Sequence, residues 1–161
     1  MRFTLFCFTI IIFLSACKDK VEDIEPLIIE DEKSSIVVTI ENIIEIEGQM
    51  VVALYSNETD WETDVPNRST GHEYEVQRVE VDADKMTFTY KDIVAGDYGV
   101  TLYQDINSNN EVDLLAGLLP TEPYGFSNNF TPTFSAPAFS DVSFIIEDMQ
   151  QLEITISLIQ P

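Results

Sequence analysis

The feature that most constrains this chain is a set of short segments in which apolar and polar residues alternate. The clearest is L-E-I-T-I-S-L at residues 152–158, where every second residue is apolar, and the same period recurs at 36–41, 86–91 and 98–102. Successive side chains of a strand point to opposite faces, so this pattern predicts strands with one buried face. No segment has a helical period. We therefore expect an all-β fold, a single antiparallel β-sandwich of about seven strands, immunoglobulin-like or transthyretin-like.

Two segments predict the arrangement of strands within the sandwich. Residues 49–55 (Q-M-V-V-A-L-Y) are apolar on both faces, as expected of a central strand, whereas residues 73–81 are polar and predict an edge strand. The strands at 86–91 and 98–104 are close in sequence, and we expect them to form a hairpin.

Three stretches have less regular patterns. Residues 56–71 are rich in turn formers and predict a long loop, with Trp61 as a lid over the edge of the core. Residues 130–140 contain two prolines and predict an ordered crossing whose phenylalanines cap the core. Val142, Phe144 and Ile146 then predict one more strand.

The N-terminus has the organisation of an export signal. A basic start is followed by an apolar run at residues 3–13, too short to span a bilayer, and then by Leu14-Ser15-Ala16-Cys17. These four residues resemble the bacterial lipobox, which predicts a signal peptide at 1–16 and a lipid on Cys17. The alternative is an ordinary secretory signal or an N-terminal anchor. Residues 17–34 are acidic and predict a tether, and the folded domain is expected at 35–161.

The cysteine content supports this interpretation. The two cysteines are Cys7, inside the apolar run, and Cys17, so the domain after cleavage could have no internal disulfide and no thiol nucleophile. A lipid on Cys17 would hold the domain on a membrane. We expect a cell-envelope location, lipid-anchored at the outer membrane on its periplasmic or surface face.

The charge balance is strongly acidic. Eight basic and 29 acidic residues give a net charge of −21. Arg2 is the only charged residue in 1–16, so removal of this segment would give a net charge of −22. Such a chain repels phosphate backbones, so we expect no nucleic-acid partner. High solubility alone is an alternative explanation of the bias.

The segment D-I-N-S-N-N-E-V-D, residues 105–113, has the spacing of a calcium loop. Asp105, Asn107 and Asn109 fall at positions 1, 3 and 5, the carbonyl of Glu111 at 7, and Asp113 at 9. Asn110 stands at position 6, where a left-handed backbone is required, and asparagine tolerates that conformation. Position 12 is Ala116, so the bidentate glutamate of an EF-hand is missing.

The expected ion is calcium, bound weakly. Glu122 could add an oxygen if the chain folds back, and extracellular sites of this kind have dissociation constants of about 10⁻⁴ to 10⁻³ M. The alternative is that these residues only form a tight turn, since Asp and Asn side chains bond readily to nearby backbone groups.

The segment Y-G-F-S-N-N, residues 124–129, combines aromatic and amide side chains. Tyr124, Phe126, Asn128 and Asn129 are therefore candidates for a recognition loop that binds a sugar. The interpretation that we favour is structural, with the aromatic rings filling the end of the sandwich and the amides satisfying backbone groups.

These motifs resemble the bacterial family of domains of unknown function numbered 2141. The matching residues are Asp105, Asn107, Asn109, Asp113, Pro120, Glu122 and the run 124–129, followed by A-P-A-F-S-D at 136–141. Gln104 departs from the family, in which histidine is common at this position, and this weakens the case for an imidazole-assisted site. The resemblance covers approximately residues 36–158. It implies a secreted or envelope-attached β-sandwich with no established activity.

Three functions are open at this point. We expect a non-enzymatic envelope lipoprotein whose calcium-stabilised loop supports a binding or structural module, with an unknown protein or glycan partner. An accessory sugar-binding module is the second candidate. A carboxylate-based hydrolase is the third and the weakest, since His72 is the only histidine and no nucleophile stands near it in sequence.

Overall fold

The computed structural model describes residues 33–67, 70–117 and 119–161. The expected signal peptide, Cys17 and all of the expected tether except Lys33 and Ser34 lie outside these ranges. Within them, no helix is both long and apolar enough to cross a membrane.

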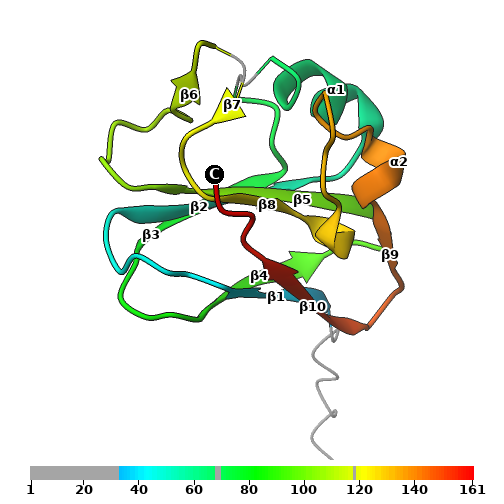
Figure 1. Cartoon of the computed structure of the whole chain (residues 1–161). Helices are drawn as coiled ribbons and strands as arrows, with labels where there is room; N and C mark the ends of the chain where they lie inside the picture. Colours follow the sequence, from blue (N-terminus) through cyan, green and yellow to red (C-terminus); the bar gives the residue numbers. More distant parts are fainter. Residues whose placement is uncertain (1–32, 68–69, 118) are drawn as a thin grey trace, which may run out of the picture. The chain divides into compact units, whose positions relative to one another are not determined.

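Strands are the main regular elements of the described chain, and short helices lie in two of the connections between them (Figure 1). The strands are β1 (Ser34–Glu41), β2 (Gln49–Tyr55), β3 (Glu75–Glu80), β4 (Met86–Ile93), β5 (Gly96–Asp105), β6 (Leu114–Leu115), β7 (Leu119–Pro120), β8 (Tyr124–Phe126), β9 (Phe144–Ile146) and β10 (Gln151–Ser157). The helices are α1 (Glu58–Asp64), the 3₁₀ turn η1 (Ser127–Asn129) and α2 (Phe139–Val142).

Two sheets pack face to face, which confirms the predicted all-β sandwich. One sheet has three strands in the order β10-β1-β4; the other has five, in the order β3-β2-β5-β8, with β9 also pairing with β5. Most neighbouring strands are antiparallel, but β1 and β10 run parallel, with Ile36 beside Leu152 and Ile40 beside Ile156. The predicted edge position of the polar strand at 73–81 is confirmed, because β3 lies at the end of its sheet.

The main core lies between the two sheets. It contains the apolar alternation of β1 (Ile36, Val38 and Ile40), which is fully buried, together with Phe88 of β4 and Leu102 of β5. A second core lies on the outer face of the five-stranded sheet. It is formed by Ala53, Tyr55, Trp61, Phe126, Phe139 and Val142, and α1 and α2 cover it.

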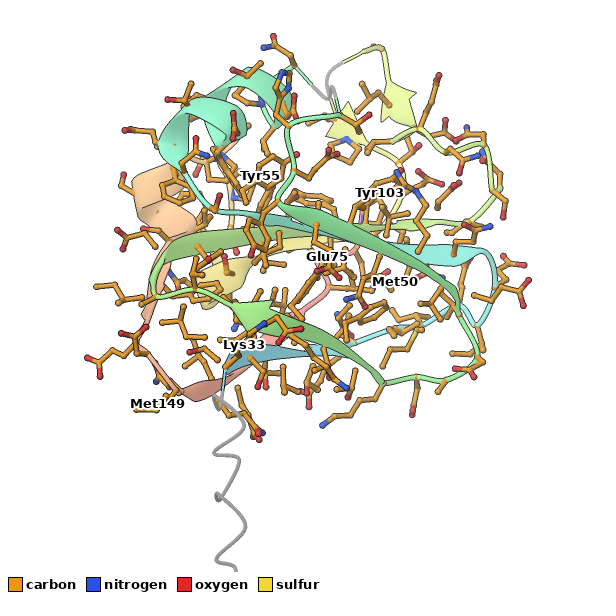
Figure 2. All side chains as sticks on the ribbon, turned by 180° about the vertical axis from the view of Figure 1, so that it is seen from behind. Lys33, Met50, Tyr55, Glu75, Tyr103 and Met149 are labelled. Carbon is orange, nitrogen blue, oxygen red and sulfur yellow. The ribbon has the colours of Figure 1, made fainter. Side chains whose placement is uncertain are left out.

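The two cores explain why β2 is apolar on both faces. Met50 points between the sheets, whereas Tyr55 points to the opposite side of its sheet, towards the helices (Figure 2). Trp61 is the centre of the second core: it is fully buried, its Nε1 donates to the Pro137 carbonyl at 2.9 Å, and its ring lies 5.3 Å from that of Tyr55.

The prediction of a long loop at 56–71 is wrong in part, because α1 occupies Glu58–Asp64. Asn57 caps this helix by accepting a hydrogen bond from the Asp60 N–H at 2.9 Å. A helix of seven residues is too short to display a full apolar period, so only the cap and the acidic first turn mark it in the sequence.

The predicted hairpin of residues 86–91 and 98–104 is also wrong. β4 pairs with β1 in one sheet and β5 pairs with β2 in the other, so the intervening residues cross between the sheets. Each strand buries one apolar face, and the two faces meet across the core. The apolar residues would alternate in the same way if the two strands were paired in a hairpin, so the sequence pattern does not distinguish the two arrangements.

The C-terminal part of the chain differs from the prediction in two further points. Val142 belongs to α2, so the strand predicted at 142–146 is only the three residues of β9. Of the phenylalanines expected to cap the core, Phe139 is buried and Phe130 is partly buried, but Phe134 is fully exposed.

Candidate functional site

The segment 105–113, which we call the acidic loop, leaves the sheet at the end of β5 and is organised around Asp105. This carboxylate is fully buried; its Oδ1 accepts from the Asn109 N–H at 3.0 Å and its Oδ2 from the Asn110 N–H at 2.8 Å. Ser108 and Asn110 have left-handed backbones, with φ of 57° and 66°. The left-handed conformation expected at Asn110 is therefore present.

The side chains of the loop converge on Asp113. Asn107 donates from Nδ2 to Asp113 Oδ2 at 2.6 Å, and Asn109 donates from Nδ2 to Asp113 Oδ1 at 3.0 Å. The Oδ1 atoms of the same two asparagines accept from the N–H groups of Asn109 and Glu111, at 3.0 and 2.8 Å. The Glu111 side chain is exposed. The spacing of the sequence motif thus brings Asp105, Asn107, Asn109 and Asp113 together.

Glu122 folds back onto this loop, as the sequence suggests. Its Oε1 accepts from the Ile106 N–H at 2.9 Å and its Oε2 from the Asp113 N–H at 3.1 Å, while only 3% of the residue is exposed. Burial raises the pKa of the Glu122 carboxyl, and the charges of Asp113 and Asp105 raise it further, against the lowering effect of the two backbone hydrogen bonds.

No basic side chain neutralises these carboxylates in the part of the chain that the structure describes. The ion pairs found there join Lys33 to Asp92, Lys85 to Glu41 and His72 to Asp64, and none of them includes a residue of the loop or Glu122. The sequence has no lysine or arginine after Lys91. Two buried carboxylates, Asp105 and Glu122, therefore rely on backbone N–H groups alone.

The loop is not a site of clustered acids. Across residues 33–67, 70–117 and 119–161, no three His, Cys, Asp or Glu side chains lie together in a way that could hold a metal. An ion at this loop would need amide and backbone oxygens as well as carboxylates, and the amides of Asn107 and Asn109, which present nitrogen to Asp113, would have to rotate.

Gly48, in the connection between β1 and β2, packs against this site. Its φ is +72°, and a Cβ atom there would collide with the Asp105 carbonyl oxygen and lie 2.6 Å from the Ile106 Cα. The turn after β1 therefore packs directly against the first residues of the loop. A glycine between two strand-like segments is the only sign of this contact in the sequence.

Gln104 faces away from the loop, since neighbouring residues of a strand point to opposite sides. It is fully buried, and its Nε2 donates to the carbonyls of Glu45 and Glu47 at 2.7 and 2.9 Å. Residue 104 thus holds the connection between β1 and β2 and does not extend the acidic site.

The segment 124–129 ties the two sheets and α2 together. Ser127 Oγ accepts from the Val100 N–H at 2.9 Å and donates to the Val142 carbonyl at 2.6 Å. Asn128 Nδ2 donates to the Ser143 carbonyl at 3.0 Å, and the Asn129 amide bonds to the Thr155 carbonyl and the Ser157 N–H. The amides of the candidate recognition loop therefore satisfy backbone groups.

The aromatic residues of this segment also pack inside the molecule. Phe126 belongs to the second core and is 8% exposed, and Tyr124 packs against it with 5.9 Å between ring centroids. In this structure the two rings thus pack against other parts of the domain.

A shallow cleft of about 330 Å³ opens beside Asn129. Phe130, Thr155 and Ser157 line it, together with Glu41, whose carboxylate pairs with Lys85 at 2.6 Å. An aromatic ring next to amide and hydroxyl groups can contact a sugar, but a single ion-paired carboxylate lacks the second acid that glycoside hydrolysis uses.

His72 forms a pair that the sequence did not reveal. Its Nδ1 lies 2.8 Å from Oδ1 of the fully buried Asp64, and its backbone N–H donates to Asp64 Oδ2 at 3.0 Å. The side-chain hydrogen bond to Asp64 and the charge of that carboxylate raise the pKa of His72. The pair joins the end of α1 to the segment that leads into β3.

The comparison with protein families decides the family of this chain. The model of the family described as "Uncharacterized protein conserved in bacteria (DUF2141)" matches residues 38–154. The chain belongs to this family. The matched range contains the acidic loop, Glu122 and the segment 124–129, and it confirms the resemblance noted from the sequence. No curated protein and no solved structure matches the chain.

Proposed function

We propose that this DUF2141 domain is a non-enzymatic, lipid-anchored module of the bacterial cell envelope, and that its acidic loop binds calcium and thereby stabilises a binding or structural surface. The observation that carries the proposal is the pair of buried carboxylates, Asp105 and Glu122, that no basic side chain contacts among the described residues. Buried charge is costly unless it is paired or coordinates a metal.

The arrangement favours a hard cation that accepts oxygen ligands. Asp105, Asn107, Asn109 and Asp113 are already brought together, and Glu122 fixes the backbone of both Ile106 and Asp113. With few carboxylates available, we expect a dissociation constant of about 10⁻⁴ to 10⁻³ M. A magnesium ion demands stricter octahedral geometry, so calcium fits this irregular set better.

A non-enzymatic role is supported by how the carboxylates are used. Asp105 and Glu122 each accept two backbone N–H groups, and neither of them lines the cleft beside Asn129. An acid–base catalyst must instead reach a substrate.

The test is thermal unfolding of residues 33–161 in chelator and in about 10 mM calcium. At 10 to 100 times the dissociation constant, calcium should stabilise the fold by roughly 1.4–2.7 kcal/mol, a rise of a few degrees in Tm. Asp113→Asn should lose most of this rise, while Asp148→Asn, which removes an exposed carboxylate elsewhere, should keep it. An equal rise in magnesium, or none in calcium, would reject the ion site.

The anchor has its own test with an internal control. Labelling of the full chain with a radioactive fatty acid should mark the wild type and Cys7→Ser, and should leave Cys17→Ser unlabelled, because only Cys17 follows the small residues of the lipobox-like run. Label that persists in Cys17→Ser would contradict the proposed anchor.

A sugar-binding module is the second candidate, and the cleft beside Asn129 favours it. Phe130 is the aromatic side chain that a sugar ring would stack on, so Phe130→Ala should abolish retardation in a gel that contains a soluble polysaccharide. Phe134→Ala, at a fully exposed aromatic residue outside the cleft, should have no effect. Equal mobility of all three proteins with and without polysaccharide would remove this candidate.

A further inference from the structure

The hairpin of β6 and β7 presents an apolar surface to solvent. Leu115 and Leu119 are directly opposite each other on the two strands, and they are 63% and 64% exposed. Cross-strand partners lie on the same face of a hairpin, so their side chains form one continuous apolar surface, which we call the leucine tip. Leu118 lies outside the described residues and is not part of it.

The described parts of the molecule do not cover the leucine tip. β6 and β7 pair with each other and with no other described strand. A Cβ atom at Gly117 would meet nothing within 4 Å. Figure 1 shows the hairpin at the opposite end of the sandwich from the beginning of β1.

The hairpin is nevertheless held firmly at its base. The Thr121 N–H donates to the Asp113 carbonyl at 2.8 Å, and the Asp113 N–H donates to the buried Glu122 at 3.1 Å. Ala116 and Gly117 turn the chain with φ of 53° and 73°. Hydrogen bonds that fix the base of the hairpin reduce the conformational entropy lost on binding, which favours its use as an anchor.

The charge around the leucine tip restricts the partner. The exposed side chain of Glu111 stands before the hairpin in the chain, and the sequence has no lysine or arginine from residue 92 to its end. Anionic lipid headgroups would be repelled, and so would a second copy of a chain with a net charge of −21. Exposed apolar patches with a polar rim mark interaction sites, and complementary charge selects the partner.

We propose that the leucine tip docks into an apolar pocket of a partner protein, and that lysine or arginine side chains rim this pocket. This goes beyond the proposed function, and it does not depend on a bound calcium ion. The tip supplies the buried apolar contact, and the exposed Glu111 together with the net negative charge of the chain sets the preference for a basic surface.

The test begins with the full-length chain in the cells that produce it. A photo-cross-linking amino acid is placed at Leu115 and, as a control of at least equal exposure, at Phe134. A protein attached through position 115 and not through 134 is identified by mass spectrometry, purified, and its affinity for the full-length chain is measured. Cross-links to lipid, to a second copy of the chain, or to nothing would overturn the proposal.

The affinity measurement then separates docking from incidental capture. Leu115→Ser combined with Leu119→Ser should weaken binding at least tenfold, because it removes most of the apolar surface, while Phe134→Ser should change it less than twofold. Binding should also weaken as salt is added. Equal affinity of the leucine variant, or an affinity that does not respond to salt, would overturn the proposal. The leucines are exposed, so an unchanged Tm checks that the variant is folded.

Discussion

Glu122 is the residue on which the acidic loop depends most. It is separated from Asp113 by the hairpin, and its carboxylate accepts the N–H groups of Asp113 and Ile106 on the two sides of the loop. Its pKa is raised, so the part of its stabilising effect that depends on protonation is complete below the unfolded pKa and is lost as the pH rises through the folded value. Ionisation of Glu122 therefore has a free-energy cost, which a bound cation would offset.

Glu122→Ala should lower the free energy of unfolding by about 2–4 kcal/mol, since two shielded N–H groups would lose their acceptor. Urea denaturation of the wild type and the variant measures this loss. Glu80→Ala, at an exposed position of β3, is the matched control and should change stability by less than about 0.5 kcal/mol. A loss of the same small size in Glu122→Ala would show that the loop holds its conformation without this carboxylate.

His72 gives the domain a dependence on pH near neutrality. Because the hydrogen bond and the charge of Asp64 raise its pKa, protonated His72 stabilises the fold below the unfolded pKa of about 6.5, and this contribution is lost as the pH rises through the folded value. His72→Asn should therefore be less stable than the wild type at about pH 5.5, with a smaller difference at about pH 8.5. Urea denaturation at both pH values tests this, and a difference that stays constant would contradict it.

At the scale of elements, β10 is an edge strand whose outer side is closed by a side chain. Asn129 Oδ1 accepts from the Ser157 N–H at 2.8 Å, and its Nδ2 donates to the Thr155 carbonyl at 3.0 Å. The amide thus imitates a neighbouring strand for this part of the edge. Unpaired edges promote association between chains, so this contact also limits aggregation.

Asn129→Gly should cost about 1–3 kcal/mol, because glycine keeps the left-handed backbone, φ 52°, and removes both hydrogen bonds. Asn110→Gly is the matched control. Its φ is 66° and only its backbone N–H bonds to Asp105, so it should cost less than about 0.5 kcal/mol. Chemical denaturation compares the two, and equal losses would mean that the Asn129 amide does not stabilise β10.

Alanine substitutions at Gly48 and Gly117 distinguish the effect of backbone strain on stability from the effect of close packing. Their φ values are 72° and 73°, but a Cβ at Gly48 would collide with the first residues of the acidic loop, whereas at Gly117 it would meet open space. Both alanine variants pay for a left-handed backbone, roughly 1–2 kcal/mol. Gly48→Ala should lose about 1–3 kcal/mol more from the collision. Equal losses in thermal or urea unfolding would show that the turn can move away from the loop.

The same elements show how far the sequence predicts this fold. The alternation in β1, β4, β5 and β10 identifies the strands and their buried faces, because the period of two is a local property. Which strands become neighbours is not local. β4 and β5 face each other across the core instead of pairing, and the parallel pairing of β1 with β10 joins residues more than a hundred positions apart.

The candidate site was predictable where spacing determines geometry. Asp105, Asn107, Asn109 and Asp113 meet because they lie in one tight loop, and Glu122 is brought to them by a short hairpin. The pairing of Asp64 with His72 was not predictable, since it depends on a two-turn helix without a visible period. The role of Gly48 depends on a contact between distant segments, which no local pattern reveals.

At the scale of the whole molecule, the five-stranded sheet is covered on both faces and its loops at one end carry the chemistry. The three-stranded sheet and the small helices shield its two faces, and the acidic loop and the leucine tip extend from the strand that crosses its centre, β5. A net charge of −21 attracts cations to the chain, and we propose that the acidic loop binds one of them.

The most direct test of the calcium site is a calcium titration followed by the backbone amide resonances of residues 33–161. We predict that the amides of Ile106 to Asp113, the first and last of which donate to Glu122, shift together and saturate with a dissociation constant of about 10⁻⁴ to 10⁻³ M. Magnesium at equal ionic strength should not reproduce the shifts. Small shifts spread over all acidic residues, without saturation, would contradict a site and leave the loop as a turn that its own hydrogen bonds hold closed.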